Sequence, residues 1–110
     1  MSSEAGVLVV YVTAPTDAAP DLARELVRRR VAACANIVPT VQSFFWWDDR
    51  VQDEPESLLI LKTRSDAFER LRDAVVELHP YDVPEVIATN VERALEPYAR
   101  WVATEVESPP

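Results

Sequence analysis

His79 and Cys34 are the one histidine and the one cysteine of the chain, and they are its candidate ligands for a soft or borderline metal ion. An imidazole suits Cu(II), and a thiolate next to a cation is both reactive and able to bind metal. Structural zinc sites use four cysteine or histidine ligands, so one copy of the chain cannot complete such a site. Each residue has a second interpretation, His79 as the end of a helix and Cys34 as a small buried apolar residue.

Carboxylates gather in the middle of the chain, where they could attract hard cations. Nineteen acidic and eleven basic residues give a net charge of −8, which opposes nonspecific nucleic-acid binding through phosphate neutralisation. The same charge attracts cations. The spacing of an EF-hand is absent, so a solvated acidic surface is the alternative interpretation. The carboxylates are those of Asp48, Asp49, Asp53, Glu54 and Glu56.

A single glycine excludes several classes of enzyme. The phosphate loop GxxxxGKS and the dinucleotide fingerprint GxGxxG both need several glycines, so that the backbone can approach phosphate. The motifs HExxH, CxxC and GxSxG are absent as well. A small enzyme of the acylphosphatase type needs a glycine-bearing anion loop with a positioned arginine. We therefore expect no enzymatic activity and no organic cofactor.

Seven segments must position these side chains. Runs rich in apolar, β-branched and aromatic residues predict strands, and apolar residues at helical spacing predict helices. Their order predicts an α+β, ferredoxin-like βαββαβ sandwich with a long hairpin and an extra C-terminal helix, in one domain over 1–110 with a core over 7–106. The short segments 1–5 and 107–110 are tails. The predicted strands are 6–13, 33–47, 51–64 and 85–91, and the predicted helices are 21–30, 68–78 and 95–106.

Local signals refine this prediction. Thr16 or Asp17 is expected to cap the first helix, and Ser65 the second. Prolines at 39 and 55 cannot donate ladder hydrogen bonds, so we expect bulges or unpaired stretches there. Residues 48–50 have turn chemistry and join the two hairpin strands.

The predicted hairpin is too long for one small domain. Fifteen extended residues span about 50 Å, whereas a domain of this length has a radius of gyration near 13 Å. Consecutive strand residues point to opposite faces, so the aromatic run places large side chains on both faces of the overhanging part. We expect these residues to pack on other subunits of a homo-oligomer, with a cover by the third helix as the alternative. The interface candidates are Phe44, Phe45, Trp46, Trp47 and Trp101.

Several motifs together resemble one family. VTAP follows the first strand, RVAACANI opens the second, LKT ends the third, and HPYDVPEVI and YARW follow later. Over about 7–106 the chain is similar to the CutA family of divalent-cation tolerance proteins. The resemblance implies a trimer like that of the PII signalling proteins, with hairpins exchanged between subunits. It also implies a link to tolerance of copper and other divalent ions, and no firm catalytic activity.

The resemblance also suggests individual site residues. His79 matches a copper-ligand position of some members, whereas Val12 and Leu78 stand where those members have a cysteine and a second histidine. Lys62, Tyr81 and Glu85 match positions near the intersubunit cleft. There they could orient a small ligand or form a buried structural pair that fixes the trimer.

The expected function is therefore that of a homotrimeric, non-enzymatic divalent-cation tolerance protein. It would bind Cu(II) or another divalent cation weakly, through His79 with carboxylates or Cys34. The alternative is a PII-like sensor or scaffold that binds a metabolite or partner protein in the cleft. The missing signal-peptide pattern and the single cysteine favour the cytoplasm. No apolar run approaches the roughly 20 residues of a membrane span, so we expect no membrane partner.

Overall fold

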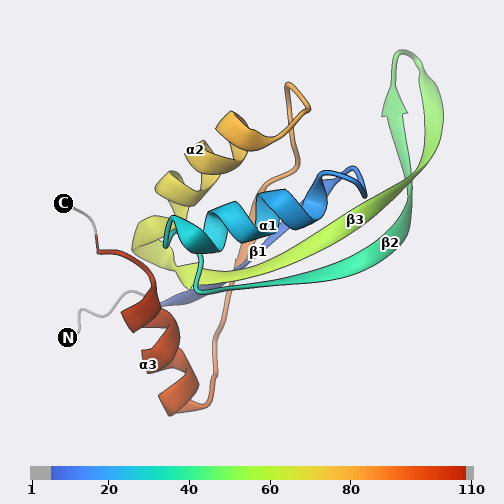
Figure 1. Cartoon of the computed structure of the whole chain (residues 1–110). Coiled ribbons are helices and arrows are strands. Elements are labelled where there is room, and N and C mark those ends of the chain that lie inside the picture. The colour runs from blue at the N-terminus through green and yellow to red at the C-terminus, as the bar shows by residue number, and fades with distance from the viewer. Residues whose placement is uncertain (1–5, 109–110) are drawn as a thin grey trace.

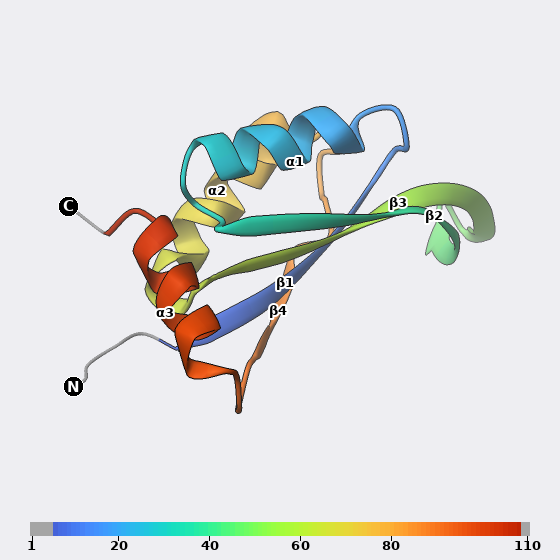
Figure 2. The ribbon, with the colours of Figure 1, turned by 60° about the horizontal axis from the view of Figure 1, so that its bottom comes forward.

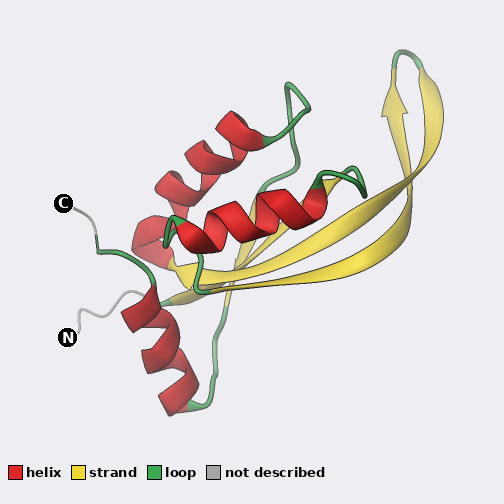
Figure 3. Ribbon diagram, viewed as in Figure 1, coloured by secondary structure: helices red, strands yellow, loops and turns green. Residues whose placement is uncertain are grey.

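A four-stranded antiparallel sheet with three helices forms the protein, described here over residues 6–108 of a computed structural model (Figures 1 and 3). The strands follow the order β2-β3-β1-β4 across the sheet, as expected for a ferredoxin-like domain. A single turn of 3-10 helix, Ser65–Ala67, precedes the second helix. The strands are β1 (Val7–Ala14), β2 (Cys34–Trp47), β3 (Arg50–Arg64) and β4 (Ile87–Asn90), and the helices are α1 (Ala19–Arg28), α2 (Phe68–Leu78) and α3 (Glu96–Glu105).

Helices α1 and α2 cover one face of the sheet and form the main core (Figure 2). Alternate residues of the two central strands point toward the helices, and Val10, Val12, Leu59 and Leu61 are fully buried there. The helices contribute residues at helical spacing, including Leu26. Burying each such side chain contributes about 1.5–3 kcal/mol, so this layer provides most of the stability of the domain.

The opposite face of the sheet is covered at one end only. Helix α3 packs there through the fully buried Val102 and through Val106, against a small group that includes Val7. Farther along the strands, apolar residues lie in the partly exposed positions that alternate with the core. Across the ladder Val9 faces Lys62, and Tyr11 faces Ile60 and Ile87. This side therefore carries apolar surface that the described part of one chain does not bury.

The hairpin of β2 and β3 extends far beyond the rest of the sheet. Strand β1 pairs with β3 only from Ser57 to Arg64, so the outer part of β3 has β2 as its neighbour in the sheet. The described chain accordingly measures 48 × 26 × 22 Å along its principal axes. In Figures 1 and 2 this two-stranded ribbon leaves the core and curls at its tip. The predicted overhang is thus present.

Three details of the hairpin test the sequence predictions. The register between the strands shifts between Val38 and Val41, which confirms the irregularity expected around Pro39. The same expectation for Pro55 is wrong, because Pro55 stays in register opposite Gln42. Its missing N–H is tolerated since this part of β3 has a neighbour on one side only. The turn itself has two residues, Asp48 and Asp49, with φ of 58° and 60°, as in a type I′ turn.

The predicted side-chain caps are wrong for both helices. Helix α1 follows Ala18, and the amides of Ala18 and Ala19 both donate to the carbonyl of Pro15, so a backbone turn replaces a Thr16 or Asp17 cap. Ahead of α2, the 3-10 turn takes the place of a Ser65 cap. Strand β4 is also shorter than the predicted 85–91, and helix α3 is shorter than 95–106.

Candidate functional site

His79 lies directly after α2, and the backbone holds both of its ring nitrogens. Nε2 is 2.7 Å from the carbonyl oxygen of Thr13, and the amide of Tyr81 donates to Nδ1 at 3.1 Å. Because Nδ1 accepts a hydrogen bond, the proton of a neutral ring must be on Nε2, which donates to Thr13. Only 7% of His79 is exposed. The ring therefore ties the loop after α2 to the end of β1.

This arrangement sets a condition on metal binding by His79. A metal ion needs an unprotonated ring nitrogen with a free lone pair, and here the lone pair of Nδ1 is used by Tyr81. Coordination would require the Tyr81 amide to turn away. Within residues 6–108, no group of three or more His, Cys, Asp or Glu side chains is arranged to hold a metal ion. The ligand role of His79 stays a prediction.

Tyr81 connects His79 to the buried carboxylate of Glu56. Its hydroxyl donates to Oε2 of Glu56 at 3.0 Å, and the rings of Tyr81 and His79 lie 4.8 Å apart. Burial, followed by the hydrogen bond and charge of Glu56, raises the pKa of Tyr81 to about 12. The hydroxyl is therefore a stable donor at neutral pH. Glu56 is 5% exposed, so it does not belong to a solvated acidic surface, although Asp48 and Asp49 do.

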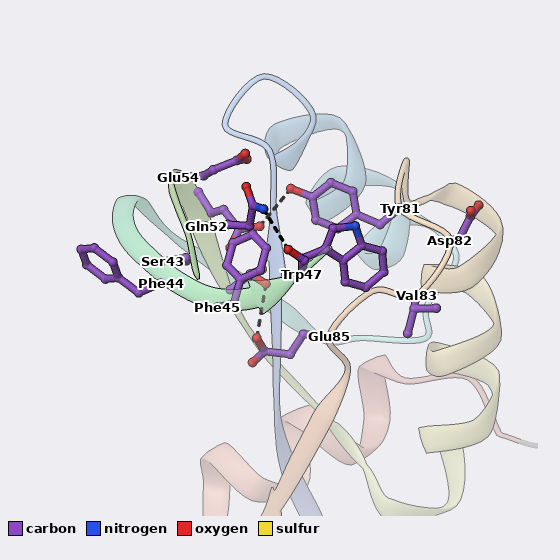
Figure 4. A pocket seen from close by; sticks show the side chains of 12 residues that line it. Ser43, Phe44, Phe45, Trp47, Gln52, Glu54, Tyr81, Asp82, Val83 and Glu85 are labelled. Carbon is purple, nitrogen blue, oxygen red and sulfur yellow. Dashed lines mark hydrogen bonds between the residues drawn. The ribbon is translucent and has the colours of Figure 1, made fainter. Parts of the chain in front are cut away.

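These residues border a pocket of about 570 Å³ between the curled hairpin and the loop after α2 (Figure 4). Figure 4 shows Trp47 projecting toward this loop, whereas Phe44 points away from it. The side-chain amide Nε2 of Gln52 donates to the backbone carbonyl of Trp47 at 3.0 Å and helps hold the curled tip. The hairpin lines the pocket with Ser43, Phe44, Phe45, Trp47, Gln52, Glu54 and Glu56, and the remainder is lined by Thr13, Tyr81, Asp82, Val83 and Glu85.

The pocket has a negative electrostatic character. Four carboxylates line it, those of Glu54, Glu56, Asp82 and Glu85, and its described lining contains no Lys, Arg or His. The hydroxyl of Thr13 donates to Glu85 at 3.3 Å. Uncompensated carboxylates next to low-dielectric aromatic walls concentrate a field that attracts cations. The arrangement suits the binding of positive charge and not of phosphate.

Lys62 and Cys34 form a separate group at the other end of the sheet. The Nζ of Lys62 lies 4.0 Å from Sγ of Cys34 and also donates to Oδ1 of Asn36. Burial, followed by the neighbouring Cys34, raises the pKa of Tyr98 on α3. The three cleft candidates are thus divided, because Tyr81 and Glu85 line the pocket and Lys62 does not.

The interface candidates are exposed in the single chain. Trp46 is 73% exposed, Phe44 66% and Trp47 63%, and Phe45 and Trp101 also remain partly accessible. The interpretation in which the third helix covers the hairpin aromatics does not apply, since α3 lies at the opposite end of the sheet (Figure 1). Trp101 instead pairs with Tyr98 on α3, with ring centroids 5.6 Å apart.

Sequence reasoning did not single out Thr13, Ser43, Gln52, Asp82 or Val83, and it placed Glu56 among carboxylates that either attract cations or form a solvated surface. Thr13 acts in part through its backbone oxygen, which no residue type reveals. Glu56 directly precedes the apolar run from Ser57 to Leu61. A charged residue at the start of a buried strand segment was the available signal.

Comparison with known proteins agrees with this fold. The family model described as CutA1 divalent ion tolerance protein matches residues 8–105. The chain belongs to the CutA1 divalent ion tolerance family. The divalent-cation tolerance protein CutA of Archaeoglobus fulgidus is 38% identical over 99 residues, which cover 89% of this chain and 96% of that protein. The CutA homolog of Xenopus laevis is 43% identical over 93 residues, or 84% of this chain.

Solved CutA structures share the architecture over nearly the whole chain. CutA1 from Oryza sativa superposes with a TM-score of 0.94 at 38% identity and covers 98% of this chain and 100% of that one. Cut A1 from Thermus thermophilus has a TM-score of 0.89 at 37% identity, covering 92% and 99%. The chain spans 62% of the Xenopus laevis relative, and 54% and 53% of chloroplastic relatives from Oryza sativa and Arabidopsis thaliana.

Proposed function

We propose that this CutA protein acts as a homotrimer in tolerance of divalent cations, by weak binding of Cu(II) or a similar ion and without enzymatic activity. The family supports the link to divalent cations. The observation that carries the proposal for this chain is the pocket beside His79, which gathers four carboxylates and no basic side chain among its described lining.

The copper site proposed here uses His79 together with carboxylates, and not Cys34. Thr13, which contacts His79, and Val9, which faces Lys62 beside Cys34, are four residues apart on β1. Four strand residues span about 13 Å, too far for one ion to reach both side chains. Cu(II) would take Nδ1 of His79 after displacing the Tyr81 amide, with carboxylate oxygens from the pocket. Cys34 would at most form a second, independent site.

The trimer is proposed from two uncovered apolar surfaces. One is the outer part of the hairpin, and the other is the half-covered face of the sheet that includes Val9, Tyr11 and Ile60. Contiguous apolar patches of this kind mark interfaces, and an exposed edge strand such as β2 invites pairing with another chain. In the trimer each hairpin would lie against a neighbouring subunit.

Calorimetric titration of metal-free protein with Cu(II) tests the metal site. Wild type and Cys34→Ser should show the same saturable binding, and His79→Ala should lose it. Glu69→Gln, on the exposed side of α2, is the matched control for a change of charge alone. Equal binding by His79→Ala and wild type, or no binding by either, would reject the site. Sedimentation on the same samples tests the trimer separately.

A second candidate function is that of a PII-like sensor or scaffold. The pocket favours it, because Tyr81 and Glu85 meet there in a space of metabolite size. This function predicts ligand-dependent thermal shifts that persist in the presence of a chelator. Loss of every such shift on adding chelator would leave only the metal function.

The cytoplasm is the compartment we propose, on the basis of the free cysteine, Cys34. Relatives are described as chloroplastic in Arabidopsis thaliana and periplasmic in Archaeoglobus fulgidus, so fractionation of cells is needed to test this. In residues 6–108 no helix is long and apolar enough to cross a membrane.

A further inference from the structure

Glu56 is a buried carboxylate that has no cationic partner among residues 6–108. Only 5% of Glu56 is exposed. Its Oε2 accepts one hydrogen bond, from the hydroxyl of Tyr81. The ion pairs among the described residues all lie elsewhere, none of them at Glu56. A buried charge is normally paired, because its desolvation is otherwise uncompensated. The described residues 6–108 therefore provide no positive group to pair with Glu56 in this pocket.

The hairpin residues that line the pocket come almost entirely from one face. Ser43, Phe45 and Trp47 alternate along β2, and across the ladder they pair with Glu54, Gln52 and Arg50. The alternation places Phe45 and Trp47 beside the carboxylates, and Trp46 on the outer face. The inner aromatics and the outer aromatics thus have different environments. The outer face suits the proposed trimer contact, and the inner face suits a ligand.

The pocket is much larger than the single metal ion proposed beside His79 would fill, so it leaves room for a second, larger occupant. Its volume is about 570 Å³, within the range of small-molecule sites. Its four carboxylates are not grouped closely enough to form a metal site within the described chain. Aromatic faces stabilise ammonium and guanidinium groups through cation–π contacts, so Phe45 and Trp47 suit an organic cation.

We propose that the pocket binds a small organic cation, an ammonium or guanidinium group carried on an apolar body. The charged group pairs with Glu56 near the Tyr81 hydroxyl, and the apolar body lies against Phe45 and Trp47. This inference rests on the second candidate function, ligand binding in the pocket, and specifies its ligand class. It does not depend on copper binding at His79.

Titration with benzylammonium in the presence of EDTA tests the inference, with benzyl alcohol and benzoate as neutral and anionic probes of the same shape. The readouts are calorimetry and the indole N–H signals of the tryptophans in a proton–nitrogen correlation spectrum. We expect saturable binding of benzylammonium with a shift of the Trp47 signal, and at least about tenfold weaker binding of the other two probes. Added salt should weaken the binding.

Two variants and one control locate the site. Glu56→Gln keeps an acceptor for Tyr81 and removes the charge, and Trp47→Leu removes an aromatic wall at the exposed tip. Each should weaken benzylammonium binding by about tenfold. Glu69→Gln changes the same net charge on α2 and should have no effect. An affinity unchanged in Glu56→Gln, or no benzylammonium binding at all, overturns the inference.

Two further results distinguish a wrong ligand class from a failure of the second candidate function, small-ligand binding in the pocket. Preferential binding of benzyl alcohol or benzoate in the pocket, reported by Trp47, rejects the cation class and leaves a small-ligand function standing. Sedimentation distinguishes a free cation from a basic side chain of a second copy. If a second copy fills the pocket, benzylammonium will bind only after the oligomer dissociates, which rejects a free-ligand site.

Discussion

The two halves of the β2-β3 hairpin differ sharply in what their apolar residues do. At the base, Leu59 and Leu61 of β3 are fully buried under α1 and α2. At the tip, on the same pair of strands, Trp46 and Val51 face each other and both are exposed. Both halves carry large apolar side chains, but only those at the base belong to the hydrophobic core of the domain. The apolar surface of the tip is left accessible, as expected if it forms the proposed contact with another subunit.

A substitution at the base is expected to have the largest effect. Leu61→Ala removes a fully buried side chain from the centre of the core. It should lower the free energy of unfolding by about 2–5 kcal/mol, through lost burial and the cavity left behind. Urea denaturation at fixed protomer concentration measures this. A loss similar to that of an exposed substitution such as Val76→Ala would mean that the base is not the core we describe.

At the tip, the corresponding substitution should affect assembly and not folding. Trp46→Ser removes a large exposed aromatic from the outer face of the hairpin. A central aromatic of an interface contributes about 2 kcal/mol or more, which corresponds to a roughly thirtyfold weaker association. Sedimentation should show dissociation at concentrations where wild type stays assembled, while circular dichroism shows an intact fold. Unchanged sedimentation would contradict the proposed role of the tip.

Between base and tip, Tyr81 reports on the buried carboxylate. Glu56→Gln should lower the pKa of Tyr81 from about 12, while burial, the largest cause, keeps the pKa above its ordinary value. The ultraviolet absorbance of phenolate against pH measures this, with Tyr81→Phe identifying the signal. A pKa of Tyr81 that is unchanged by Glu56→Gln would show that the two side chains do not interact in solution.

The same shift has a consequence for stability. Because the pKa of Tyr81 is raised in the folded state, the unfolded chain ionises first. The stabilisation by neutral Tyr81 is therefore complete below about pH 10, the ordinary tyrosine value. It is lost as the pH rises toward about 12. Tyr81→Phe should lack this part of the alkaline destabilisation.

The fold was largely predictable from the sequence because its signals are local and repeated. The run from Gly6 to Thr13 predicts one strand, and the helical spacing of Leu71, Val75 and Leu78 predicts one helix. The order of all seven such segments predicts the ferredoxin-like fold. Caps and boundaries were less predictable. Backbone groups such as the Pro15 carbonyl replaced the expected side-chain caps at α1.

The site was predicted only in part, because its contacts join distant segments. Tyr81 and Glu85, which were predicted to lie near an intersubunit cleft, line one pocket of the single chain, whereas Lys62, which was grouped with them, lies beside Cys34. Glu56 reaches Tyr81 across 25 positions of sequence, through a contact between the hairpin and the loop after α2. No periodicity in the sequence encodes that contact.

The base and the tip each contain a non-glycine residue with a positive φ, and a smaller effect on stability is expected from replacing either one. Arg30 lies two residues after the end of α1, and Asp49 lies in the hairpin turn; both have a φ of 60°. That region is unfavourable for residues with a Cβ and free of strain for glycine. The bonds from Arg30 to the Val27 carbonyl and from Val31 to the Leu26 carbonyl form a Schellman motif, which usually has glycine at this position.

Arg30→Gly and Asp49→Gly should therefore relieve the same strain in two different contexts. Each gains about 0.5–1 kcal/mol locally, after allowance for the greater freedom of glycine in the unfolded chain. Asp17→Gly, in an exposed turn without a positive φ, is the control that should gain nothing. In Arg30→Gly part of the gain is offset by the lost ion pair with Glu105, whose atoms are 3.3 Å apart.

The two variants should differ in where the gain is observed. The base belongs to the core, so Arg30→Gly should raise the midpoint of global unfolding. The tip has no core of its own, so Asp49→Gly should slow amide exchange near residues 47–50 more than it raises that midpoint. The comparison requires a subunit concentration low enough to dissociate the proposed trimer, since assembly would couple tip and base. Equal gains in global stability would mean that the tip unfolds together with the core even in the single chain, and that the two halves of the hairpin are one cooperative unit.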